Sequence, residues 1–160
     1  MTTAEDVLRV ARARKVMIAT AESCTGGMII AALTDVAGSS DVVDRGFVTY
    51  SNAAKMQMLG VQPATLDAFG AVSEQVAREM AQGALARSAA GVAVAVTGIA
   101  GPGGSDHKPE GRVCFALADA KGTHVETVEF GPTGRANVRQ ATVAHAFGLL
   151  VQALRAQDQP

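Results

Sequence analysis

Hydrophobic and polar residues follow two kinds of pattern along the chain, one typical of helices and one typical of strands. Val76, Met80 and Ala84 recur every four residues, which predicts a long helix capped by Ser73. The uninterrupted apolar run 92–96 predicts a buried central strand. The same reasoning predicts helices at about 4–14, 28–36, 53–59, 63–69, 74–88 and 135–155, and strands at 16–19, 46–50, 92–96, 112–118 and 123–130. Residues 157–160 are expected to form a frayed tail.

The order of these elements predicts the fold class. Helices alternate with strands along the chain, and the segment 119–122 has the composition of a tight turn between the last two strands. We therefore expect a three-layer α/β/α sandwich with a mixed, mostly parallel sheet of about five strands that includes one late hairpin. No repeat, linker or break in composition is visible, so residues 1–160 are interpreted as one domain.

Composition excludes several classes of protein. Apolar residues make up 48% of the chain and the net charge is −1, which excludes an intrinsically disordered protein. The small charge and the low aromatic content of 4% argue against a nucleic-acid partner. The N-terminus lacks the pattern of a signal peptide, and no apolar run is long enough to span a membrane. The two cysteines, Cys24 and Cys114, are too few for a disulfide scaffold, although a single disulfide between them stays an open alternative. We expect a cytoplasmic protein without a membrane partner.

Residues able to carry chemistry follow three of the predicted strands. The segments 22–27, 50–55 and 97–105 each come directly after a strand. Ligands of open α/β sheets gather beyond the carboxyl ends of the strands. If these strands are parallel neighbours, the three segments form one site.

The first segment combines Ser23, Cys24 and Thr25 with Gly26 and Gly27 ahead of a predicted helix. Free amides at a helix N-terminus can hold an anion or an oxyanion, and the glycines let the backbone approach a ligand. The structural alternative is ordinary helix capping by Ser23 or Thr25.

Lys55 is the informative residue of the second segment. It lies near the start of a predicted helix, where the helix dipole disfavours a cation and lowers the pKa of an amine. A lysine of lowered pKa can serve a serine as its base. The alternatives are a solvated surface lysine and, for the only tyrosine, Tyr50, a packing role at the end of its strand.

The third segment is rich in glycine but matches neither a P-loop nor a dinucleotide fingerprint, since Gly104 and Ser105 stand where a P-loop needs Lys and Ser or Thr. A plain glycine-rich connection is the alternative reading. His107, His124 and His145 are scattered, so no metal site is predicted.

Five blocks of sequence together resemble the CinA C-terminal domain family, in the same order and at matching spacing. They are 21–27, 48–55, 59–61, 70–74 and 97–102, within a resemblance that covers about residues 5–155. The resemblance implies a bacterial amidohydrolase that converts nicotinamide mononucleotide and water into nicotinate mononucleotide and ammonia, in the recycling of NAD. It also implies a homodimer or larger homo-oligomer and no cofactor.

The resemblance also implies roles for individual residues. Ser23 corresponds to the nucleophile, Lys55 to its base and Tyr50 to a supporting catalytic residue. An arginine at the start of the last helix, Arg135 or, one turn later, Arg139, is expected to bind phosphate. The other expected substrate-binding residues are Thr25, Gly26, Gly27, Thr97, Gly98, Ala100 and Gly101.

The chain departs from the family pattern in two places. Glu110 and Arg112 interrupt the motif that usually follows the glycine-rich loop, and Thr133 stands where an aspartate is expected before Gly134 and Arg135. Two other hypotheses stay open: Cys24 as nucleophile, because a helix N-terminus lowers the pKa of a thiol, and a non-enzymatic nucleotide- or partner-binding domain.

Overall fold

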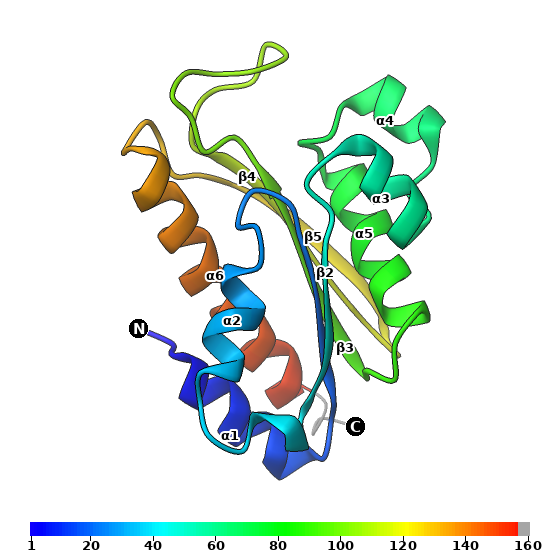
Figure 1. The fold of residues 1–160 in the computed structure, drawn as a ribbon, viewed down its shortest axis with the longest axis vertical. Coiled ribbons are helices and arrows are strands. Elements are labelled where there is room, and N and C mark those ends of the chain that lie inside the picture. The colour runs from blue at the N-terminus through cyan, green and yellow to red at the C-terminus, as the bar shows by residue number, and fades with distance from the viewer. Residues whose placement is uncertain (157–160) are drawn as a thin grey trace.

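The computed structural model describes residues 1–156, in which helices cover both faces of an open five-stranded sheet (Figure 1). The predicted tail 157–160 lies outside the described residues. The helices are α1 (Ala4–Arg14), α2 (Met28–Thr34), α3 (Asn52–Leu59), α4 (Pro63–Phe69), α5 (Glu74–Ala86) and α6 (Arg135–Ala156), with a short 3₁₀ helix at Ser39–Asp41. The strands are β1 (Ile18–Glu22), β2 (Val43–Val48), β3 (Val92–Gly98), β4 (Arg112–Asp119) and β5 (Gly122–Glu129).

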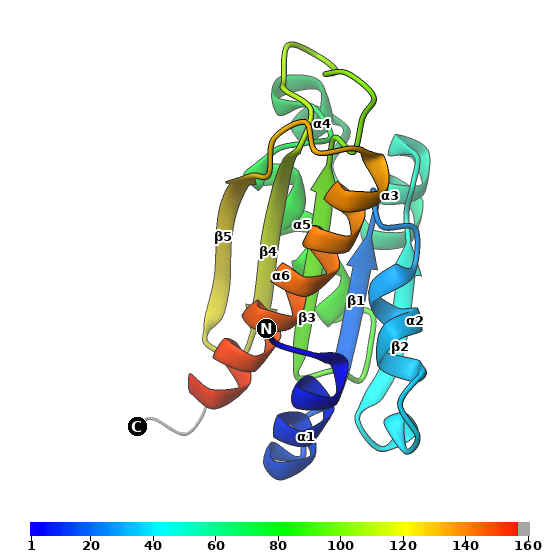
Figure 2. The ribbon, with the colours of Figure 1, turned by 90° about the vertical axis from the view of Figure 1, so that its left-hand side faces the viewer.

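The strand order is β2-β1-β3-β4-β5 (Figure 2). β1 pairs in parallel with both β2 and β3, while β4 runs antiparallel to β3 and to β5. Four of the five strands therefore point the same way, and β4 and β5 form the hairpin expected late in the chain. This confirms the predicted fold class.

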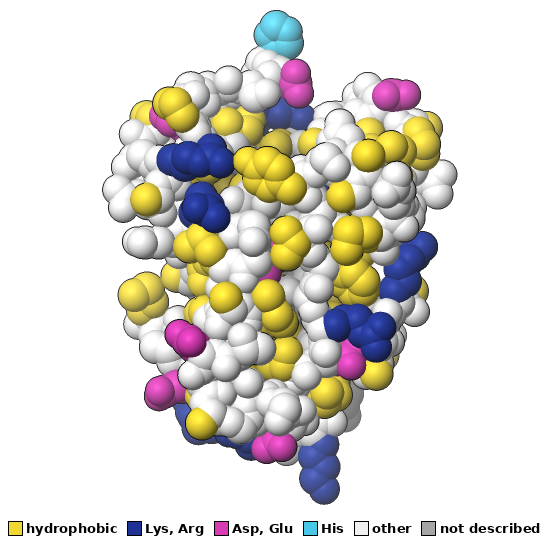
Figure 3. Space-filling view, viewed as in Figure 1, with side chains coloured by type: hydrophobic (Ala, Val, Ile, Leu, Met, Phe, Trp, Pro, Cys, Tyr) yellow, Lys and Arg dark blue, Asp and Glu magenta, His cyan; other side chains and the backbone are white. Residues whose placement is uncertain are grey.

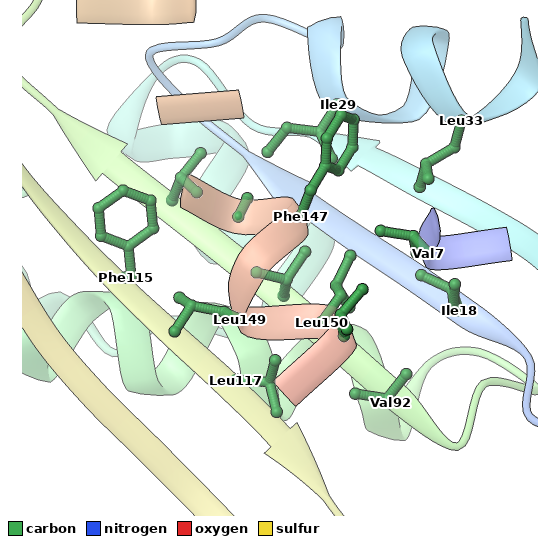
Figure 4. Close-up of a cluster of buried hydrophobic side chains, with 14 of the residues drawn as sticks. Val7, Ile18, Ile29, Leu33, Val92, Phe115, Leu117, Phe147, Leu149 and Leu150 are labelled. Carbon is green, nitrogen blue, oxygen red and sulfur yellow. The ribbon is translucent and has the colours of Figure 1, made fainter. Parts of the chain in front are cut away.

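The two faces of the sheet carry side chains of different size. Val92, Val94 and Val96 face the layer of α1, α2 and α6, together with the larger strand residues Phe115 and Leu117. Figure 4 shows Val92, Phe115 and Leu117 on this side, with Leu150 of α6 packed over the sheet. The alternate positions, among them Ala93 and Ala95, face the layer of α3, α4 and α5. Small residues on that face let α5 lie close to the sheet. The alternation follows from the two-residue period of a strand.

All five strands differ by at least one residue from their predicted bounds, and the larger differences are in β1, β2 and β3, which continues to Gly98 rather than ending at residue 96. β1 begins at Ile18 rather than residue 16, because the chain leaves α1 through Lys15 in the left-handed conformation (φ 55°) and needs two more residues to reach the sheet. β1 also continues through Thr20 and Glu22, which are polar but buried. β2 begins at Val43 rather than 46, since it lies at the edge of the sheet, where polar residues tolerate water.

Within residues 1–156, no helix has the length and hydropathy needed to cross a membrane.

The contact between α5 and α3 predicts an effect on stability at Gly83. A Cβ at Gly83 would lie 2.0 Å from the backbone oxygen of Leu59, so Gly83→Ala forces the two helices apart. We expect this variant to lose about 1–3 kcal/mol of unfolding free energy or more. Gly148, inside α6, is the matched control, because the nearest atom to its Cβ is 4.0 Å away. Gly148→Ala should be neutral or stabilising by up to about 1 kcal/mol. Urea unfolding of both variants tests this, and equal losses would contradict it.

Candidate active site

The carboxyl ends of β1, β2 and β3 lie side by side and bring the three predicted segments together. Ser23 follows β1, Lys55 lies on α3 after β2, and Thr97 is in the last part of β3. Because both pairings of β1 are parallel, all three ends meet at one edge of the sheet. Topology therefore creates the site that spacing alone could only suggest.

Ser23 and Lys55 are in direct contact. Nζ of Lys55 lies 2.9 Å from Oγ of Ser23, and the two residues are 32 positions apart in the chain. Nζ also donates to the backbone oxygens of Thr49, at 2.9 Å, and Tyr50, at 3.1 Å. A proton acceptor must lie within about 2.6–3.2 Å of the hydroxyl that it deprotonates. This pair meets that condition.

The start of α3 explains how Lys55 reaches this position. Ser51 is the N-cap of α3, and its Oγ accepts the backbone N–H of Ala54. Helix formation then turns Lys55 inwards, where only 1% of it is exposed. The hypothesis of a solvated surface lysine is thereby excluded.

Burial also changes the acidity of Lys55. Loss of hydration disfavours the ammonium form and lowers the pKa of Lys55 to about 8, against a smaller opposing effect from Cys24. At pH 7 roughly one molecule in ten then carries a neutral amine, which is a usable base. A neutral amine has two N–H groups for the two backbone oxygens and one lone pair for the Ser23 hydroxyl. The ammonium form can donate to the same three oxygens, so the three contacts of Nζ accommodate both protonation states.

A cleft opens beside this pair and has two connected parts. The inner part, of about 230 Å³, is lined by Ser23, Cys24, Tyr50, Asn52, Lys55, Ala71, Val72, Thr97, Gly98, Ala100 and Arg135. The outer part, of about 370 Å³, shares Tyr50, Ala71, Val72, Gly98, Ala100 and Arg135 and extends along the loop 101–106 to Lys108. The shared lining residues join the two parts into one cleft.

Arg135 and Tyr50 meet across the cleft. The Arg135 guanidinium donates to the Tyr50 hydroxyl, at 3.1 Å, and to the backbone oxygen of Gly101, at 2.7 Å. Tyr50 is 62% exposed, so its ring stands at the rim rather than in the core. Basic side chains also gather over the start of α6 in the space-filling view (Figure 3). The outer part of the cleft thus offers a positive charge to an anionic group.

Arg139 has different partners from Arg135. Its Nε donates to the backbone oxygen of Cys24, at 3.0 Å, and its Nη2 donates to the backbone oxygen of Thr25, at 3.3 Å. Arg139 therefore holds the turn that carries Ser23, whereas Arg135 lines both parts of the cleft.

The N-terminus of α2 is not the free anion site that the sequence suggested. The carboxylate of Glu22 accepts the backbone N–H groups of Ile29, at 2.9 Å, and Ile30, at 3.0 Å. The N-cap of α2 is Gly27, which has no side chain that could cap the helix. The alternative prediction, that Ser23 or Thr25 caps α2, was therefore also wrong. Thr25 is fully buried, and its hydroxyl donates to Glu22 rather than towards the cleft.

The two glycines of this turn are required by its backbone. Gly26 and Gly27 have φ values of 58° and 107°, a region that other residues avoid. A Cβ at Gly26 would lie 3.5 Å from the Arg139 guanidinium, and one at Gly27 would lie 3.4 Å from Val48. They shape the turn around Ser23, and of the described residues 24–27 it is Cys24 that lines the cleft.

Thr97 and Lys108 fix the far wall of the cleft. Oγ1 of Thr97 donates to the backbone oxygen of Ala71, at 2.8 Å. Nζ of Lys108 donates to the backbone oxygens of Phe69, at 2.6 Å, and Val72. Sequence reasoning did not identify Lys108, Ala71 or Val72, because no local pattern shows that the loop 101–111 returns to the segment between α4 and α5.

The structure disfavours Cys24 as a nucleophile. Burial raises the pKa of the Cys24 thiol to about 12, which opposes the expected effect of the helix N-terminus. Neither part of the cleft has a histidine among its described lining residues. Cys24 and Cys114 are both free thiols. Residues 1–156 contain no group of three or more His, Cys, Asp or Glu side chains arranged to hold a metal ion.

Comparison with known proteins gives consistent matches. The model of the CinA C-terminal domain matches residues 1–154. "Nicotinamide-nucleotide amidohydrolase PncC" of Escherichia coli K12 is 49% identical over 153 residues, which are 95% of this chain and 93% of that protein. A "putative competence-damage inducible protein" of Acetivibrio thermocellus is 52% identical over 84% of this chain, which spans only 33% of that longer protein.

Solved structures show the same fold. The crystal structure of competence damage-inducible protein A from Klebsiella pneumoniae has a TM-score of 0.91 at 38% identity, and covers 95% of this chain and 94% of its own. That of the competence/damage inducible protein CihA from Agrobacterium tumefaciens has a TM-score of 0.86 at 52% identity, with 94% and 96% covered.

The lowered pKa of Lys55 predicts how stability depends on pH. The pKa is about 8 in the folded chain and 10.5 for an ordinary lysine, so between these values the unfolded chain binds more protons. The free energy of unfolding therefore rises with pH across this window, by up to about 3 kcal/mol. Relative to Lys55→Met, the natural chain should gain stability between pH 7 and pH 10 in denaturant unfolding. Lys121→Met controls for the loss of one positive charge. Parallel pH profiles for the natural chain and Lys55→Met would contradict the assignment.

Proposed function

The chain belongs to the family of CinA C-terminal domains, and we propose that it is an amidohydrolase that converts nicotinamide mononucleotide and water into nicotinate mononucleotide and ammonia. The observation that carries the proposal is the contact between Lys55 Nζ and Ser23 Oγ at the base of a two-part cleft. The name of the E. coli relative supplies the substrate class.

The cleft suits both ends of this substrate. The carboxamide would enter the inner part, beside Ser23, and the ribose phosphate would occupy the outer part. What supports Arg135 as the phosphate ligand is that it lines both parts, next to the glycine-rich loop 101–105. The guanidinium of Arg139 is directed instead at the backbone oxygens of Cys24 and Thr25. A guanidinium binds phosphate oxygens through charge-assisted hydrogen bonds.

In the proposed reaction, the neutral amine of Lys55 takes the proton of Ser23 as Oγ attacks the carboxamide carbon. Lys55 then gives this proton to the departing nitrogen, the carbon–nitrogen bond breaks, and ammonia leaves an acyl-serine. Water then gives a proton to the same amine and attacks the ester carbon. The amine passes this proton to Oγ of Ser23 as the ester bond breaks, and the acid that is formed loses its own proton to solvent. The backbone N–H of Cys24 is the candidate among residues 24–27 for holding the oxyanion, because Cys24 lines the cleft.

Three broader expectations belong with this proposal. The reaction returns a pyridine nucleotide to NAD synthesis, so recycling is its expected place in metabolism. A cytoplasmic location and assembly into a homodimer or larger homo-oligomer stay predictions. The proposed supporting role of Tyr50 is separate from these three and rests on two hydrogen bonds: its backbone oxygen accepts from Lys55, and its hydroxyl accepts from Arg135.

The nucleophile is tested by Ser23→Ala. Ammonia release from nicotinamide mononucleotide should fall at least about 1,000-fold, because no other hydroxyl replaces the attacking group. Ammonia is measured with purified protein, and circular dichroism checks the fold. Cys24→Ala is the matched comparison and should stay within about tenfold of the natural rate, since backbone N–H groups are unchanged. If Cys24→Ala loses the reaction and Ser23→Ala keeps it, the thiol is the nucleophile. If the natural chain releases no ammonia, the chain is a binding domain.

The base is tested by comparing Lys55→Arg with Lys55→Ala. A guanidinium stays protonated, so arginine keeps the charge but cannot take a proton. Both variants should therefore lose kcat to a similar extent, by about 100-fold or more. A lysine that only attracted the phosphate would give a different result: Lys55→Arg would retain most activity, and Lys55→Ala would chiefly raise KM. Steady-state kinetics of both variants separates the two roles.

A further inference from the structure

Glu22 is a fully buried carboxylate that the proposed reaction does not use. It is the last residue of β1 and directly precedes Ser23, and none of its surface is exposed. A buried carboxylate is costly unless hydrogen bonds replace its hydration. Its surroundings therefore indicate what it does.

Hydrogen-bond donors surround both carboxylate oxygens. Oε1 accepts from Oγ1 of Thr25, at 2.6 Å, and from the backbone N–H of Ile29, at 2.9 Å. Oε2 accepts from the backbone N–H of Ile30, at 3.0 Å, and from Oγ1 of Thr20, at 3.4 Å. Glu22 thus joins the end of β1, the middle of the following turn and the start of α2.

Glu22 lies on the opposite face of the sheet from the cleft. Its carboxylate meets α2, whereas the next residue, Ser23, meets Lys55 from α3. Successive residues of a strand point to opposite faces, which explains the difference. Glu22 is not among the described residues that line either part of the cleft. Any effect of Glu22 on the reaction must pass through the turn 23–27.

Other contacts hold the same turn at its remaining polar groups. Arg139 donates to the backbone oxygens of Cys24 and Thr25, and the backbone N–H of Ser23 donates to Val96 at 3.1 Å. With Glu22 binding the hydroxyl of Thr25 and the start of α2, the turn is fixed on both sides. A displacement of about 1 Å in a reacting group can cost about 100-fold in rate.

We propose that Glu22 is a positioning residue that fixes the turn 23–27, so that Oγ of Ser23 stays at hydrogen-bonding distance from Nζ of Lys55. Glutamate is required rather than glutamine, because the backbone groups of Ile29 and Ile30 can only donate. The amide nitrogen of a glutamine would face one of them and leave it without an acceptor. The effect on turnover rests on the proposed function, whereas the effect on the turn does not.

The experiment compares Glu22→Gln with Thr3→Ala. Both variants weaken the cap of a helix in the same layer, since Thr3 caps α1 and accepts the backbone N–H of Asp6. Amide hydrogen exchange across residues 23–30 and steady-state kinetics with nicotinamide mononucleotide are measured well below the melting temperature. For Glu22→Gln we expect exchange in 23–30 to rise at least tenfold and kcat to fall at least tenfold, with KM within twofold. For Thr3→Ala we expect faster exchange at the start of α1 and unchanged kcat.

Each result that differs from these expectations overturns one part of the proposal about Glu22. Unchanged exchange in 23–30 means that Glu22 does not fix the turn. A looser turn with unchanged kcat, or an equal loss of kcat in Thr3→Ala, means that Glu22 does not position Ser23. If the natural chain releases no ammonia, the proposed function fails, and the exchange measurement still decides whether Glu22 fixes the turn.

If Glu22→Gln does not fold, Thr25 supplies a second comparison. Thr25→Val removes the hydroxyl that binds Glu22 and leaves the cap of α2 in place, while Thr25→Ser keeps the hydroxyl. We expect Thr25→Val to lower kcat at least threefold with KM unchanged and to speed exchange in 23–27, and Thr25→Ser to restore both. Equal behaviour of the two variants contradicts the proposal.

Discussion

The amine of Lys55, held out of water against Ser23, is the interaction on which the site depends. A buried ammonium group is unstable unless its environment replaces its hydration, and here the replacement is one hydroxyl and two backbone oxygens. Those oxygens belong to Thr49 and Tyr50, which lie in the connection between the end of β2 and the start of α3. The fold therefore has to bring that connection next to the end of β1, and parallel pairing of the two strands does so. Burial, against a smaller opposing effect of Cys24, lowers the pKa of this lysine to about 8.

The sheet contributes to the site through the different sizes of its two faces. Alanines at alternate positions of β3 let the α3–α5 layer lie near the strands, while valines and larger side chains fill the opposite layer. Lys55 comes from the first layer, and Glu22 points into the second. Ser23 thus stands between a layer that supplies its Lys55 contact and a layer that holds its backbone. The two-residue period of β1 assigns these neighbours to opposite sides.

The sequence predicted the fold class well, because that class depends on local turn patterns and on strands that are clearly apolar. It placed Ser23 and Lys55 in one site only through the resemblance to a known family and on the condition that their strands are parallel neighbours, which the pairing of β1 with β2 meets. Helix caps such as Thr3 and Ser51 could also be predicted from local patterns. The role of Glu22 in accepting the first backbone N–H groups of α2 could not be predicted, since a carboxylate next to three polar residues gives no sign that it will be buried. The signal that did exist was negative: the residue at the N-cap is a glycine, so the cap had to come from elsewhere. The anchoring of the loop by Lys108 depends on tertiary folding and had no local signal.

The two arginines near the start of α6 show how one spacing leads to two chemical roles. Arg135 and Arg139 are four residues apart, so they lie on the same side of the helix about one turn from each other. α6 runs past the end of β1, and each turn of the helix therefore meets a different part of the site. The first turn reaches the rim, where Arg135 meets Tyr50 and Gly101. The next turn reaches the backbone of Cys24 and Thr25. An arginine whose hydrogen bonds go to backbone oxygens orders a turn, whereas one at an open rim can exchange such bonds for those of an anion. The same residue type thus holds the turn that carries Ser23 at one turn of the helix and lines the open cleft at the other.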